Sequence, residues 1–138
     1  MTTNSDGLAG VTFTAADPGT PRGAADGQVY VIGIFSGPVA PSNFEAKVVI
    51  KVFSAKTIPA SPKWADVEPI FKEYFNLYPS MRPFLDLSSA TQVQGRKDRV
   101  LALITMDEDD PQYMPISRDL SRDKKKLIEA WVKAGAPI

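Results

Sequence analysis

The sequence predicts an α+β fold, with a short antiparallel β-sheet of two or three strands followed by a bundle of three to four helices. Residues 28–55 contain two segments that are dense in β-branched and aromatic side chains, as strands are. From Trp64 onwards apolar side chains recur at steps of three and four residues, which is the period of a helix. The chain has 138 residues, a length that fits one domain.

Residues 1–27 are predicted to be a flexible arm, because they are rich in Gly, Ala, Asp, Thr and Pro. One piece of the arm, GVTFTA at 10–15, alternates well enough to form a short strand. Residues 28–138 are predicted to form a single globular domain, with a β-hairpin at 28–55 and a helical module at 61–138.

The two predicted strands are QVYVIGIF at 28–35 and EAKVVIKVFSA at 45–55. In the second segment Lys47 and Lys51 alternate with apolar residues, so they mark a partly solvated face. The linking residues SGPVAPSNF are too many for a two-residue turn, so we expect an irregular loop. Because two strands alone are marginal in water, the pair is expected to pack on a helix, a third strand or a partner.

The apolar side chains of the first predicted helix recur at helical steps between Trp64 and Tyr78. Asp66 is the expected N-cap, which would place Pro69 in the first turn, where a missing N–H costs little. Pro79 is expected to end this helix, because a proline pushes the preceding residue out of the α region.

Three further helical segments follow. Ser88 is expected to cap SATQVQ at 89–94, and DRVLALI at 98–104 suits a short buried helix. Ser121 is expected to cap the last helix and Gly135 to stop it. In that helix Lys124 and the two lysines after it are expected on or beside the polar face, opposite the apolar stripe of Leu127, Ile128, Trp131 and Val132.

The chain contains no cysteine and no histidine. This excludes a disulfide, a Cys/His zinc site, a Ser-His-Asp triad and an imidazole acid or base. Any catalysis would depend on carboxylates, Lys, Tyr, Ser or an oxygen-ligand metal site. We therefore expect no cofactor and no metal, identify no catalytic residue, and favour a role other than an enzyme.

The charge and hydropathy patterns concern partners and location. The 16 basic and 16 acidic side chains balance, so no global field favours nucleic acid or an anionic membrane. No apolar run approaches the roughly 20 residues that a spanning helix needs. The first ten residues have neither the basic nor the apolar region of a secretory signal, so the cytoplasm is the expected location.

Three local motifs have ordinary explanations. The acidic run DEDD at 107–110 lacks the spacing and glycine of a calcium loop, so a solvated loop is favoured. The basic segments GRKDR at 95–99 and RDKKK at 122–126 each include an acid and lack interleaved aromatic residues, as a charged helix face does. The S-x-x-K pattern at Ser121 is short, and this serine is expected to serve as a helix cap.

The segment from about Trp64 to Ile138 resembles the cytochrome c-like helical module of bacterial proteins. The likeness is carried, in order, by VEPIF, FLDLSS, YMP and DLSRDKKKLIEAWVKAGAP. In haem-bearing relatives the first helix leads into C-x-x-C-H, and the methionine of a YMP-like loop can be the sixth iron ligand. Met114 matches that methionine, while Phe75, Tyr78 and Pro79 replace the attachment residues. The chain is most similar to haem-less versions of the module, some of which accompany ferritin-like or oxidase-like enzymes.

A core that lost its haem would contain a void of several hundred cubic ångströms, which a small fold does not tolerate. We expect side chains to fill this space, and the alternative is a residual apolar pocket beside Tyr78 and Met114. The candidate residues are Phe75, Tyr78, Met81, Phe84, Ile104, Tyr113 and Met114.

The resemblance and the scarcity of catalytic residue types imply a non-catalytic accessory or protein-interaction subunit. It would associate with a bacterial oxidase-like or ferritin-like enzyme, or with further copies of itself as a homo-oligomer. The alternative is a small-molecule-binding protein, or an enzyme, that uses the vacated haem pocket.

Because no cysteine is present to form thioether bonds, the protein is expected to carry no covalent haem even when it is made in cells that attach c-type haem. An absorbance spectrum of the purified protein should therefore lack a Soret band. A Soret band that persists after denaturation would contradict this prediction.

Overall fold

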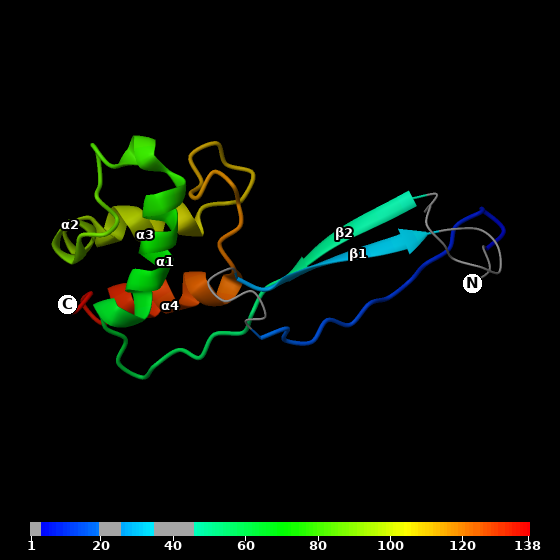
Figure 1. Cartoon of the computed structure of the whole chain (residues 1–138), viewed down its shortest axis with the longest axis horizontal. Coiled ribbons are helices and arrows are strands. Elements are labelled where there is room, and N and C mark those ends of the chain that lie inside the picture. Colours follow the sequence, from blue (N-terminus) through cyan, green and yellow to red (C-terminus); the bar gives the residue numbers. More distant parts are fainter. Residues whose placement is uncertain (1–3, 20–25, 35–45) are drawn as a thin grey trace. The chain divides into compact units, whose positions relative to one another are not determined.

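The structure is a computed structural model that describes residues 4–19, 26–34 and 46–138 (Figure 1). The elements within this part are, in order, β1 (Gln28–Ile34), β2 (Ala46–Val52), α1 (Trp64–Leu77), the 3₁₀ turn η1 (Pro79–Met81), α2 (Ala90–Gly95), α3 (Lys97–Thr105) and α4 (Arg122–Lys133). The predicted α+β fold, a short antiparallel sheet followed by helices, is confirmed.

The chain divides into two compact units, Met1–Ala55 and Lys56–Ile138. The boundary falls between the predicted hairpin and the predicted helical module. The sequence pattern predicts both of them as parts of one domain, residues 28–138. The described residues of the main hydrophobic core all lie between Trp64 and Ala136, so the strands contribute no side chain to it. Each unit is therefore described by itself.

In the first unit β1 and β2 form an antiparallel pair in which Ile32 lies opposite Val48 and Val31 opposite Val49. Opposite residues share a face of the sheet, so the pairing sorts the side chains into two sets. We call one set the apolar face; apart from Gln28 at its end, it consists of Tyr30, Ile32, Ile34, Ala46, Val48, Ile50 and Val52. The other face carries both strand lysines. The predicted short strand at 10–15 is wrong, because no strand forms there.

The end of the hairpin near Ser54 is closed by side-chain hydrogen bonds. The Ser54 backbone N–H donates to Asp26 at 3.1 Å, and the Gly27 N–H donates to the Ser54 hydroxyl at 3.0 Å. Gly27 has φ +73°, and a Cβ at this position would lie 2.0 Å from the carbonyl oxygen of Val52. Only glycine satisfies both the left-handed backbone and this close approach.

In the helical unit α4 packs against both α1 and α3 (Figure 1). The centre of the contact is aromatic: Trp131 is fully buried, and its ring centroid lies 5.8 Å from that of Trp64 and 6.1 Å from that of Phe71. The buried apolar residues of α1 and of α4 recur at helical spacing, as the sequence predicts. Among the described helices, none has the length and apolar character needed to cross a membrane.

Lys124 departs from the expectation of an exposed polar face. It is only 5% exposed, and its Nζ lies 2.7 Å from Glu73 Oε2 on α1. The long apolar stem lets the ammonium group reach a carboxylate on the neighbouring helix while the rest of the side chain packs. The two following lysines are more exposed.

The start of α1 differs from the prediction. The helix begins at Trp64, so Asp66 is the third helical residue, not the N-cap, and its carboxylate accepts the Lys63 N–H at 2.8 Å. Pro69 consequently lies inside the helix and not in its first turn. The earlier start has a tertiary cause, since the Trp64 N–H donates to the carbonyl of Pro137 at 2.9 Å.

The cap of α2 is Ser89, so the prediction of Ser88 is wrong by one residue. The Ser89 hydroxyl accepts the N–H of Gln92 at 3.4 Å. Ser88 is held instead by Asp86, whose carboxylate accepts its hydroxyl at 2.6 Å and its N–H at 2.8 Å. This local turn uses the serine that the sequence pattern offers as a cap.

Both predicted ends of α4 are confirmed. The Ser121 hydroxyl accepts the Lys124 N–H at 3.3 Å. At the other end Gly135 has φ +89°, and its N–H donates to Val132 while that of Ala136 donates to Trp131. These two bonds form a Schellman motif, in which the glycine satisfies carbonyls that the helix leaves free. We call residues 134–137 the C-terminal turn.

Replacing Gly135 by alanine is expected to lower the free energy of unfolding by about 1–2 kcal/mol. The cost is conformational, because φ is +89° and nothing lies within 4 Å of the added Cβ. Gly95→Ala is the matched control, since that site is equally open but has no positive φ. Denaturant unfolding followed by tryptophan fluorescence measures the helical unit, which holds both tryptophans. Equal effects of the two substitutions would contradict the prediction.

Candidate functional site

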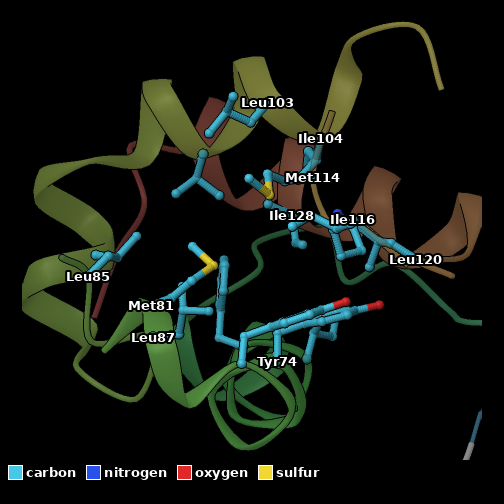
Figure 2. A pocket seen from close by; sticks show the side chains of 15 residues that line it. Tyr74, Met81, Leu85, Leu87, Leu103, Ile104, Met114, Ile116, Leu120 and Ile128 are labelled. Atoms are coloured by element: carbon cyan, nitrogen blue, oxygen red, sulfur yellow. The ribbon is translucent and has the colours of Figure 1, made fainter. Parts of the chain in front are cut away.

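The helical unit contains an apolar cavity of about 90 Å³ (Figure 2). Its walls come from α1, η1, the loop that follows η1, α3, the loop that precedes α4, and α4. The lining side chains are those of Ile70, Phe71, Tyr74, Tyr78, Met81, Leu85, Leu87, Val100, Leu103, Ile104, Met114, Pro115, Ile116, Leu120 and Ile128.

Four of the residues that the sequence proposes for a pocket lie together in this lining: Tyr78, Met81, Ile104 and Met114. Helical spacing places Ile104 on the inner side of α3. The loop that carries Met114 is fastened to the same helix, because the Met114 N–H donates to the carbonyl of Leu103 at 3.1 Å. The methionine of the YMP motif therefore faces the apolar interior.

The other three proposed residues lie outside the lining. Phe84 is 73% exposed. Phe75 is partly buried and packs against the hydrophobic core outside the cavity lining, and the guanidinium of Arg82 lies 4.1 Å from its ring centre. Tyr113 is almost fully buried beside the cavity loop, and the ammonium of Lys125 lies 4.8 Å from its ring centre. These positions belong to the surroundings of the cavity and not to its wall.

Tyr74 lines the cavity but is not among the seven candidate pocket residues that the sequence suggests. It lies one helical turn before Tyr78, and the two rings stack with centroids 6.2 Å apart. The same spacing that placed both on the apolar stripe could have identified it as a wall residue. Figure 2 shows the Tyr74 ring along one side of the cavity, with its hydroxyl at the edge of the group of lining side chains.

The tyrosine hydroxyls are hydrogen-bonded to residues outside the lining. The Tyr74 hydroxyl donates to Asp119 at 3.1 Å, and the Tyr78 hydroxyl donates to Ser117 at 2.7 Å. Ser117 in turn donates to Asp119 at 2.5 Å, so the four residues form one network. Burial, followed by the charge and hydrogen bond of Asp119, raises the pKa of Tyr74 far above its ordinary range. The phenol is therefore a fixed neutral donor and not an acid near neutral pH.

The chemistry of the cavity follows from these contacts. Its wall is formed by hydrocarbon, thioether and aromatic ring surface, and the hydroxyls of its two lining tyrosines donate to Asp119 and Ser117. General acid–base catalysis needs a titratable group within hydrogen-bond reach of a bound molecule. The arrangement suits the binding of an apolar molecule better than its conversion.

The geometry matches neither a haem site nor a metal site formed by carboxylates. A haem fills several hundred cubic ångströms, far more than the cavity offers. Within residues 4–19, 26–34 and 46–138 no three or more Asp or Glu side chains are grouped so that they could hold a metal ion. The acidic loop at 107–110 is engaged in local turns, with Asp107 and Asp110 each accepting a backbone N–H two residues on.

Tyr74→Phe is expected to lower the free energy of unfolding at neutral pH by about 1–2 kcal/mol, because the Asp119 carboxylate loses a part-buried hydrogen bond. A second effect concerns alkaline pH. The unfolded chain releases the phenol proton near pH 10 while the folded protein retains it, so Tyr74 makes stability fall as the pH rises above about 10. The variant should show a shallower fall between pH 9 and about pH 11 in urea unfolding followed by tryptophan fluorescence. Identical pH slopes would contradict the assignment.

Comparisons of the chain with protein-family models, with curated proteins and with solved structures gave no match. The resemblance of residues 64–138 to the cytochrome c-like module therefore stays a prediction that depends on the sequence motifs alone.

Proposed function

We propose that the chain is a non-catalytic protein-interaction subunit, and that its β-hairpin binds another polypeptide through the apolar face. The observation that carries the proposal is the composition of that face. Seven of its side chains are apolar or aromatic, and neither strand lysine lies on it. Tyr30, Ile34 and Val48 are 46%, 50% and 44% exposed, so a large part of this surface meets solvent.

Such a face is unfavourable in water. Fully burying one Val or Ile side chain contributes about 1.5–3 kcal/mol relative to exposure, and this sheet leaves several half exposed. A two-stranded sheet is marginally stable by itself and gains most from packing on a second apolar surface. The same surface that destabilises the isolated hairpin would therefore stabilise a complex.

The occupant that fits best is a second copy of this chain. The apolar face has no charged side chain that would select a partner of opposite charge, and the whole chain has no net charge to oppose self-association. Two copies related by a twofold axis present identical faces, and face-to-face packing of sheets about 10 Å apart is a common way to bury them. Lys47 and Lys51 would remain on the outer faces, in water.

The non-catalytic part of the proposal has separate support. The chain has no cysteine and no histidine, so no thiol or imidazole side chain is present to act in catalysis. The cavity of the helical unit presents apolar walls, and its two tyrosine hydroxyls are already bonded to Asp119 and Ser117.

The test is the mass of the full-length protein in solution, measured by light scattering after size-exclusion chromatography. The expected mass is twice that of the 15.0 kDa chain. Val48→Glu places a carboxylate in the middle of the apolar face and is expected to give the monomer mass. Val49→Glu is the matched control, because it introduces the same group at the next residue but on the opposite face, and should keep the doubled mass.

Far-UV circular dichroism of each variant shows whether the hairpin and helices remain folded. A strictly monomeric wild-type protein at tens of micromolar concentration would contradict self-association. A loss of the doubled mass that is equal in both variants would also contradict it, because the effect would not depend on the face.

A further inference from the structure

We propose that the cavity of the helical unit is a binding site for a small neutral hydrocarbon group, either a single ring or a short alkyl chain. This inference concerns a different surface from the hairpin and does not depend on the proposed self-association. It follows from the wall chemistry, the size and the access of the cavity.

The wall of the cavity is apolar. Lining side chains such as Ile70, Val100 and Ile128 are buried and purely aliphatic. A water molecule is stable in a cavity only where it finds two to four polar partners, and here the hydroxyls of the two lining tyrosines donate outside the lining, to Asp119 and Ser117. The cavity therefore favours apolar occupants over water and over charged molecules.

The size of the cavity limits which molecules it can hold. The cavity measures about 90 Å³. A dry engineered cavity of about 150 Å³ lined by similar side chains holds benzene, so this one is at the lower limit for a ring and wide enough for a slender alkyl chain. Two of its wall residues, Met81 and Met114, are unbranched and can change rotamer to admit a slightly larger group.

The cavity can be reached from the solvent. The cavity is not sealed, because Ile116 in its lining is 62% exposed and the two methionines are half-buried. Figure 2 shows Met81 and Met114 projecting toward each other from the turn after α1 and from the loop before α4. A ligand can thus enter past side chains without unfolding of a helix.

An apolar ligand in the cavity would gain dispersion contacts with the wall. Wall atoms that face an empty space lose dispersion contacts on that side, and an apolar occupant restores them. Binding to the folded state alone also stabilises that state by mass action. A ligand of the right class should therefore both perturb the wall side chains and raise the midpoint of thermal unfolding.

The experiment uses the full-length protein labelled with ¹³C at the methionine methyl groups. Benzene and n-hexane are the two probes, and benzoate is the charged counterpart of benzene. The Met81 and Met114 methyl signals are expected to shift saturably with at least one hydrocarbon probe. The Met106 signal is the internal control, because Met106 lies just beyond α3 and outside the lining, and it should stay in place.

A pair of variants tests the location. Leu103→Phe adds a ring to the wall and is expected to weaken hydrocarbon binding about tenfold, a change that corresponds to about 1.4 kcal/mol. Ala102→Phe is the matched control: it adds the same ring at the preceding, exposed residue of α3 and should leave the affinity unchanged.

Three results would overturn the proposal. The first is the absence of a saturable shift at Met81 and Met114 with either hydrocarbon. The second is a benzoate affinity equal to that of benzene, because a dry apolar wall discriminates against charge. The third is equal binding by folded Leu103→Phe and Ala102→Phe. If Leu103→Phe does not fold, the wild-type comparison of probes and of methionine signals still decides.

Discussion

The helical unit depends on one carbonyl group, that of Pro137 in the C-terminal turn. It accepts the indole N–H of Trp131 at 3.0 Å and the backbone N–H of Trp64 at 2.9 Å. A single acceptor thus joins the end of α4 to the first residue of α1, and it satisfies the polar atom of the fully buried Trp131. The neighbouring carbonyl of Ala136 accepts the Gln94 amide at 2.8 Å and adds α2 to the same junction. Because buried donors are costly without acceptors, this turn determines how the three helices meet.

The features that the sequence predicts well are those with a local cause. Periodicity separates strands from helices, and Ser121 and Gly135 mark the two ends of α4 because capping requires a side-chain acceptor at one end and a left-handed residue at the other. The cavity residues Tyr78 and Met114 were proposed from the resemblance, because they align with a haem-attachment residue and with the methionine of the YMP-like loop, and both lie in the cavity lining.

The features that were missed have tertiary causes. The beginning of α1 depends on the Pro137 carbonyl, which is more than seventy residues further along the chain, so Asp66 was assigned the wrong capping position. Lys124 was expected on a polar face because nothing local indicates that Glu73 lies across from it. Phe84 is apolar by composition, yet it is exposed because its loop turns it outward, and only the three-dimensional path of the chain determines that.

The pairing of β1 with β2 has a consequence for how the hairpin reaches its final alignment. A connection as long as the one between Ile34 and Ala46 does not impose an alignment as a two-residue turn does. If β2 slipped by one residue, every side chain of that strand would change sides, and Lys47 and Lys51 would move among Tyr30 and its apolar neighbours. A misaligned hairpin could then not be covered by another apolar surface without burying two ammonium groups. Association would therefore act as a selection step that accepts only the correctly aligned strands.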